Sequence, residues 1–407
     1  MVDTPLKRSL KLPAVTFYGV GAILGAGIYV LIGEVAAVAG YYAPLSFLVA
    51  AVIALFSAFS YAELSARFPR SAGEAVYVHE AFGKRRLTQL IGILVVITGV
   101  VSAATMATGV VGYVQLFIQW PTAIIIFLFV IGIAAVAMWG IEESAWVVML
   151  ITLLEIGGLF YVVFIAADDM MALKIGDIAR GNFNNSGVLT GLFLGSFLAF
   201  YAYIGFEDMV NIAEEIQQPE RILPSAILLA LFIATTLYML VAVAALSVLP
   251  PERLANSTAP LAAVVLARGE SAAWIGTISL IAVVNGAIVQ LIMASRVIYG
   301  MASQQLLPRS LAKVNSRTAT PLLATLLCTV VTLILALLLP LSSLAQATSI
   351  IVLIVFALVN IALIRIKQIS PAANTITYPL WVPYVGALLC TIILTIKAAI
   401  DFFDLGG

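Results

Sequence analysis

Long apolar runs separated by short polar segments recur along the whole chain of 407 residues. About 20 apolar residues in a helix can cross the roughly 30 Å hydrocarbon core of a bilayer, and a helix satisfies its own backbone hydrogen bonds there. The pattern predicts spans near residues 14–37, 43–66, 86–118, 121–139, 144–167, 189–214, 224–249, 272–304, 320–340, 344–366 and 380–403. The expected fold is an all-α polytopic membrane protein with about eleven transmembrane helices.

Composition supports this fold class and narrows the partners. Apolar residues make up 63% of the chain and charged residues 10%, against roughly a quarter charged in soluble domains. The formal net charge is zero, which argues against a nucleic-acid partner and leaves the lipid bilayer as the expected surroundings. The two cysteines, Cys328 and Cys390, lie in apolar spans without a metal-ligand spacing. The sequence therefore predicts neither a metal site nor a cofactor.

The distribution of lysine and arginine predicts the orientation in the membrane. If the N-terminus is cytoplasmic, fourteen of these residues fall in cytoplasmic segments and four fall outside. Cytoplasmic loops carry the excess of positive charge, so residues 1–13 are expected inside the cell. An odd number of spans then gives an extracellular C-terminus. We expect a multi-pass protein of the cell membrane, that is, the inner or plasma membrane.

The longest polar segment, residues 168–188, divides the spans into two groups and is expected to be an extracellular loop. Five spans in residues 14–167 precede it, and five in residues 189–366 follow it. Residues 367–407 hold an additional eleventh span and the C-terminus. Because five is odd, the second group crosses the membrane with the opposite topology. This layout predicts an inverted repeat.

Two spans carry interruptions at membrane depth. The first contains GVGAILGAGIYVLIG at residues 19–33, with five glycines, each of which costs a helix about 1 kcal/mol relative to alanine. The sixth contains GSFLAFYAYIGFEDMV, in which Gly195, Ala202 and Gly205 bracket polar and aromatic residues. Matching interruptions predict a transporter's central binding site, because backbone groups freed in lipid need a ligand, an ion or water. The alternative is that the glycines only let helices pack closely.

Four motifs occur in order along the chain: GAILGAGIYVLIG, YAELSARFPRSAGEAVYVHEAFG, FLAFYAYIGFEDMVNIAEEIQQPERILPSAI and SRVIYGMASQQLLPRSLAKVNSRTATP. Together they resemble the amino acid, polyamine and organocation transporter family, and the resemblance covers nearly the whole chain. It implies a LeuT-type fold with a five-plus-five inverted repeat and discontinuous helices 1 and 6. It also implies secondary active transport by alternating access, usually of an amino acid.

The resemblance further implies which backbone groups bind the substrate. The amides that would hold its carboxylate are those of Gly25, Ala26 and Gly27, at the positive end of the outer half-helix. The carbonyl groups that would hold its amino group are those of Ile23, Phe200 and Tyr203. Tyr201, next to Ala202 in the second break, falls where family members often place an aromatic gate.

Two further spans supply candidate specificity residues. The eighth span carries two amide side chains in its middle run, Asn285 and Gln290. A structural hydrogen bond between helices is the competing role for both. The resemblance places Gln290 near the substrate side-chain pocket and ranks it above Asn285. In the third span, which has no charge after Arg86, small polar and apolar residues such as Ser102 and Met106 favour a neutral L-amino acid.

Ionisable residues inside spans are candidates for coupling. Glu155 lies at the middle of the fifth span with no cation in that span, although a charge at this depth costs about 3 kcal/mol. The resemblance places it where many family members carry a lysine thought to substitute for sodium, so this chain departs from the pattern. We hypothesise that Glu155 is the proton-coupling carboxyl group, with Glu207 as the alternative. A structural glutamate, either protonated or paired with arginine, is the competing interpretation.

Sodium coupling is less favoured, because the eighth span has no hydroxyl between Ser279 and Ser295. The predicted function is therefore proton-coupled uptake of neutral L-amino acids. Its alternatives are an amino acid exchanger, a cationic amino acid or polyamine transporter and, more distantly, a channel or a solute-sensing receptor. An enzyme is not expected, because the single histidine, His79, lies in a loop and leaves no Ser–His pair inside the bilayer. The sequence leaves the oligomeric state open.

Overall fold

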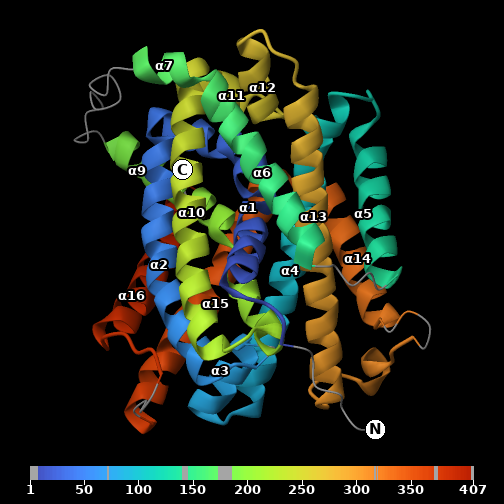
Figure 1. Ribbon diagram of the computed structural model, residues 1–407, viewed down its shortest axis with the longest axis vertical. Coiled ribbons are helices and arrows are strands. Elements are labelled where there is room, and N and C mark those ends of the chain that lie inside the picture. Colours follow the sequence, from blue (N-terminus) through green and yellow to red (C-terminus); the bar gives the residue numbers. More distant parts are fainter. Residues whose placement is uncertain are drawn as a thin grey trace.

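The computed structural model describes residues 8–70, 73–139, 145–172, 186–315, 318, 320–370 and 375–404. Within these ranges the secondary structure is helical, apart from one isolated parallel bridge between Leu10 and Ile216. Figure 1 shows the long helices running roughly side by side along the longest axis of the molecule. The predicted all-α class is confirmed.

The long helices are α1 (Leu12–Ala39), α2 (Ala43–Arg67), α4 (Arg85–Gln115), α5 (Thr122–Trp139), α6 (Ala145–Ile165), α9 (Ser186–Phe200), α10 (Pro219–Val248), α13 (Ala273–Ser303), α14 (Leu322–Leu338), α15 (Leu341–Ile369) and α16 (Trp381–Asp404). The shorter α-helices are α3 (Gly73–Phe82), α7 (Ala167–Ala172), α11 (Pro251–Ala255) and α12 (Pro260–Ala267). Four 3₁₀ segments complete the described elements: η1 (Gly40–Tyr42), η2 (Tyr201–Tyr203), η3 (Glu207–Glu215) and η4 (Arg309–Ala312).

Nine helical stretches in the described chain are long and apolar enough to cross a membrane. One of them, Leu12–Arg67, contains both α1 and α2, which the short η1 separates. The apolar α14 is slightly shorter than these stretches. A polytopic membrane protein is therefore confirmed, whereas the number of eleven spans and the inverted repeat stay predictions.

Prolines mark the starts of several helices. Pro219, Pro251 and Pro260 are the first residues of α10, α11 and α12. Proline has no backbone N–H, and the first turn of a helix leaves that group without an intrahelical partner in any case. The chain before α10 turns sharply at Gln218, whose φ is 47°. These residues fix where the long apolar runs are cut into separate helices.

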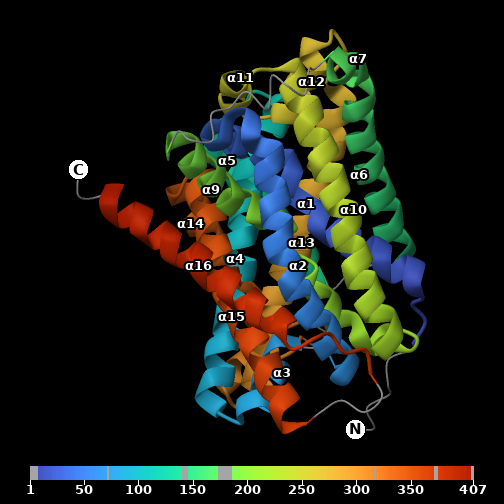
Figure 2. The same cartoon turned by 90° about the vertical axis from the view of Figure 1, so that its left-hand side faces the viewer.

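The buried centre of the bundle is α1, which packs against α9, α10, α6 and α13. Its residues from Ile28 to Ile32 are at most 5% exposed. In Figures 1 and 2, α3 lies at one end of the bundle and α7, α11 and α12 lie at the other. Figure 2 also shows α16 crossing the outside of the bundle obliquely. The helix with the predicted glycine break is thus enclosed by other helices, as a central binding site requires.

Candidate functional site

The interruption expected in the first span lies at Gly25. This residue has φ 6° and ψ −109°, which are not helical, whereas α1 continues on both sides of it. A Cβ atom built on Gly25 would lie 3.8 Å from the Cα of Gly286 and 4.0 Å from the Cε of Met106. Gly25 therefore faces α13 and α4 across ordinary contact distances. The side chain of Ala26 lies outside the described part of the structure.

The second break follows α9, which ends at Phe200 and passes through η2 into extended backbone at Ile204. Gly205 then has φ 129°, a conformation that side-chain-bearing residues rarely adopt. A Cβ atom on Gly205 would lie 2.4 Å from the carbonyl oxygen of Ala22 in α1. Two features therefore require glycine at this position: its backbone conformation and its closeness to the first break.

The two breaks contact each other directly. A Cβ atom on Gly27 would lie 2.7 Å from the Cα of Ala202, so the two backbones are nearly touching. The hydroxyl group of Tyr238, on α10, lies 2.7 Å from the carbonyl oxygen of Ile23 and 2.8 Å from that of Ala202. Its single proton is shared between one acceptor from each break. Our reading of the sequence missed Tyr238, although its mid-span position is the same signal that singled out Tyr201.

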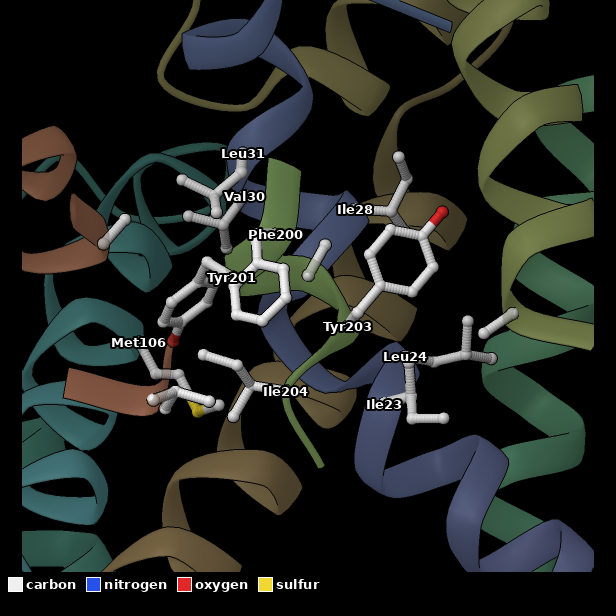
Figure 3. Close-up of a cluster of buried hydrophobic side chains, with 14 of the residues drawn as sticks. Ile23, Leu24, Ile28, Val30, Leu31, Met106, Phe200, Tyr201, Tyr203 and Ile204 are labelled. Carbon is white, nitrogen blue, oxygen red and sulfur yellow. The ribbon is translucent and has the colours of Figure 1, made fainter. Parts of the chain in front are cut away.

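The aromatic residues of the second break point in different directions. The hydroxyl groups of Tyr201 and Ser102 lie 3.0 Å apart, which connects η2 to α4. Figure 3 shows the Tyr201 hydroxyl directed towards Met106, with Tyr203 on the other side of the break. The hydroxyl of Tyr203 donates to the carbonyl oxygen of Phe47 at 2.9 Å. Tyr201, Ser102 and Met106 are thus brought together, whereas the Tyr203 side chain points towards α2.

The two amide side chains of α13 are buried and only partly satisfied. Gln290, 4% exposed, donates from Nε2 to the Oδ2 of Asp208 at 2.9 Å. Its Oε1 atom has no hydrogen-bond partner, and neither has the Oδ1 atom of Asn285, which is 7% exposed. Both residues line a small cavity beside the first break, together with Gly286. The structure therefore brings Asn285 to the same site as Gln290, although the sequence ranked it lower.

Glu155 lies in α6 and is 0% exposed. Neither of its carboxyl oxygens has a hydrogen-bond partner within the described structure. Its backbone carbonyl accepts a hydrogen bond of 2.6 Å from the hydroxyl of Tyr29, which belongs to the outer half of α1. Glu155 is therefore a buried carboxyl group whose burial is offset only in part, by the side chain of Asn285 on α13, and it lies directly against the helix that carries the first break.

Glu207 is buried at the end of the second break. Its Oε2 atom accepts a hydrogen bond of 2.8 Å from the backbone N–H of Gly205. This bond satisfies one of the backbone donors that the break frees, and it gives Glu207 a structural role. Sequence reasoning named Glu207 as a coupling candidate and did not detect this bond.

Outside the spans, α3 carries a further buried acid, Glu74. Its Oε1 atom accepts a hydrogen bond of 3.1 Å from the hydroxyl of Tyr61. Burial raises the pKa of the Glu74 carboxyl group above its ordinary value of 4.5, and the bond from Tyr61 opposes that shift.

A second acid at the same end of the bundle is fully paired. Glu63 of α2 is buried, lies 2.6 Å from Arg67 and lies 2.8 Å from Lys367 of α15. In the described residues, no group of three histidine, cysteine or acidic side chains is placed to hold a metal ion.

Comparisons with known proteins agree over nearly the whole chain. A model of the family described as amino acid permease matches residues 10–403. The branched-chain amino acid permease BcaP of Bacillus subtilis is 31% identical over 394 residues, which cover 91% of this chain and 83% of that protein.

Two eukaryotic relatives are longer than this chain. The mitochondrial cationic amino acid transporter 3 of Arabidopsis thaliana is 29% identical, covering 90% of this chain and 63% of the relative. The human cationic amino acid transporter 4 is also 29% identical, covering 92% of this chain and 62% of the relative. The chain therefore spans less than two thirds of the length of these two relatives.

Proposed function

The chain belongs to the amino acid permease family, and from this membership we propose that it carries neutral L-amino acids by secondary active, alternating-access transport coupled to protons. We place it in the cell membrane with a cytoplasmic N-terminus and an extracellular C-terminus, on the basis of the lysine and arginine distribution. The transporter role itself, rather than an enzymatic one, follows from the family.

The observation that carries the proposal is the contact between the breaks in α1 and in the α9–η3 segment. Both breaks free backbone groups, and their backbones are so close that a Cβ atom added at Gly27 would lie 2.7 Å from the Cα of Ala202. The amides of residues 25–27 would take the substrate carboxylate. The carbonyl oxygen of Ile23 has two lone pairs and could accept from the substrate ammonium while retaining its bond from Tyr238.

Glu155 supplies the coupling in this proposal. A carboxylate without a partner at membrane depth is costly, whereas the protonated acid is neutral. Binding and release of one proton at Glu155 would change the charge of α6 next to Tyr29 of the broken helix. Glu207 is the weaker candidate, because it already accepts a hydrogen bond from Gly205.

Purified protein in proteoliposomes tests the proposal. Wild-type protein is expected to accumulate a labelled neutral amino acid when an inward proton gradient is imposed. The Glu155→Gln variant, which keeps the shape and removes the titratable group, is expected to lose gradient-driven accumulation and its pH dependence. It should retain counterflow, in which unlabelled amino acid inside drives entry of label, because that exchange needs no net proton movement.

Glu252→Gln is the matched control, because Glu252 is an exposed acid on α11. Unchanged gradient-driven uptake in Glu155→Gln would contradict the coupling role. An absence of saturable counterflow in the wild-type protein would contradict transport altogether.

A cationic amino acid is the second candidate substrate, and the names of the Arabidopsis and human relatives are the observation that favours it. Inhibition of labelled uptake by arginine and lysine, but not by neutral amino acids, would establish this alternative.

A further inference from the structure

A small cavity beside the Gly25 break has a distinctive lining. Its walls come from four helices: Gly21 and Ala22 of α1, Met106 of α4, Val148 of α6, and the α13 segment that includes Asn285 and Gln290. The cavity volume is about 20 Å³, which is enough for one water-sized polar group. It can therefore receive the end of a side chain, but not a whole amino acid.

The buried side-chain atoms without a partner among the residues that line this cavity are two hydrogen-bond acceptors. The nitrogen of Gln290 is bound to Asp208 at 2.9 Å, so the amide is turned with its oxygen free. The Oδ1 atom of Asn285 is also without a partner. Buried polar atoms are nearly always hydrogen-bonded, and leaving one unmet costs free energy. A group that enters the cavity must therefore bring N–H or O–H donors.

The two free acceptors are uncharged amide oxygens, so they favour a neutral donor group on the substrate over a cationic one. An ammonium or guanidinium group removed from water needs a carboxylate partner. Asp208 already accepts from Gln290, whose amide occupies the cavity wall. Glu155, which interacts with Asn285, is neutral when it carries the proton that the coupling proposed above assigns to it. A neutral donor, by contrast, is matched by amide oxygens alone.

The distance between the proposed carboxylate site and the cavity limits which substrate side chains can reach it. Gly21 and Gly25 are four residues apart in α1, so they are about 6 Å apart along the helix axis. Serine and threonine carry their hydroxyl groups one carbon from Cα and do not reach across one helical turn. The carboxamide of a glutamine-type side chain does reach, and it is neutral and carries two N–H donors.

We propose that this cavity is a subsite for the carboxamide end of the substrate side chain, so that the transporter prefers glutamine-like amino acids to aliphatic or cationic ones. The proposal rests on the transport function proposed above and specifies its substrate class. Asn285 and Gln290 are its specificity-determining residues. The backbone amides of the Gly25 break do not distinguish one substrate side chain from another.

Counterflow in proteoliposomes with the full-length chain tests the subsite. Labelled glutamine, leucine and lysine are compared at equal concentration. We expect glutamine to be exchanged at least tenfold faster at limiting concentration, because leucine would leave the buried acceptors unmet. Asn285→Leu and Gln290→Met keep the approximate side-chain size and remove the acceptors. Each is expected to lower the ratio of glutamine to leucine exchange by about tenfold.

Gln304→Met is the control for the same chemical change, because Gln304 is an exposed residue directly after α13. Asn285→Leu also leaves the Gln290–Asp208 bond intact, so it separates the loss of an acceptor from the loss of that bond. Saturable leucine or lysine exchange with no preference for glutamine would overturn the subsite and leave the transport function standing. So would an unchanged ratio in both variants. No exchange of any amino acid would overturn the transport function and the subsite with it.

Discussion

A methyl group added at Gly27 should separate the two broken helices. Its carbon atom would lie 2.7 Å from the Cα, 2.8 Å from the Cβ and 3.0 Å from the carbonyl oxygen of Ala202. Ordinary van der Waals contacts between such atoms begin near 3.4 Å. The atoms that obstruct the methyl group include backbone, so a rotamer change cannot relieve the clash. Gly27→Ala therefore requires the breaks to move apart by several tenths of an ångström.

The magnitude follows from two opposing terms. Overpacking of a tight interior costs about 1–3 kcal/mol, and the higher helix propensity of alanine returns about 1 kcal/mol. We expect a net loss of about 0–2 kcal/mol in the free energy of unfolding for Gly27→Ala. Gly157 in α6 is the matched control, because a Cβ atom there meets nothing within 4 Å. Gly157→Ala should therefore gain up to about 1 kcal/mol.

The assay is reversible unfolding of the purified protein in mixed micelles, together with thermal-shift titration of the substrate. Gly27→Ala should be less stable than Gly157→Ala by about 1–3 kcal/mol, and its affinity for substrate should fall. Equal stability of the two variants would refute the close contact between the breaks. A variant at Gly27 with reduced stability but normal affinity would refute the link between this contact and the binding site.

Two acids at the α3 end of the bundle give further predictions. Since burial raises the pKa of Glu74 above 4.5, the folded protein holds that proton more tightly, and the stabilisation is lost as pH rises through the raised pKa. The melting temperature of Glu74→Gln should therefore exceed that of the wild type by an amount that grows as pH rises above about 4.5. Glu80→Gln, at an exposed acid, is the control. A difference in melting temperature that stays constant with pH would contradict the raised pKa of Glu74. Glu63→Gln leaves Arg67 and Lys367 without their carboxylate partner. It should lower the free energy of unfolding by about 3 kcal/mol. A decrease below about 0.5 kcal/mol would show that the ion pairs of Glu63 do not stabilise the fold.

Much of the fold could be predicted because a helix that spans a bilayer needs a long apolar run, and such runs are visible in a single sequence. Apolar length gives the helices, and glycine clusters at membrane depth give the positions of the breaks. Gly25 and Gly205 are the residues at which the backbone departs from the helix or adopts positive φ. Both lie in the stretches that the sequence pattern had marked.

The contacts between distant segments could not be predicted in the same way. Gly27 and Gly25 look alike in the sequence, yet one packs against Ala202 and the other faces ordinary space towards Gly286. That difference depends on the register of η2 against α1, which no local pattern encodes. The same is true of Tyr238, whose hydroxyl serves both breaks from α10. Its role follows only from the packing of three segments, α1, η2 and α10.

The first and sixth spans are joined at several levels. Near the α3 end, the backbone N–H of Leu10 donates to the carbonyl of Glu215, and the N–H of Gln217 donates to the carbonyl of Leu10. At the breaks, Gly27 and Ala202 nearly touch. Since these contacts involve backbone, α1 and the α9–η3 segment are expected to move as one body in any alternating-access cycle.

The contacts of that body with α4 and α13 also include side-chain hydrogen bonds. Tyr201 reaches Ser102 and Asp208 reaches Gln290 through hydrogen bonds of their side chains, which bond rotations can break and remake. The substrate would lie at this boundary, with its carboxylate on the broken helix and its side chain against α13. A ligand shifts a conformational equilibrium only by its difference in affinity for the two states. A substrate that binds both bodies at once has such a difference, whereas one that binds the broken helix alone has not, and this is why a subsite on α13 bears on transport as well as on specificity.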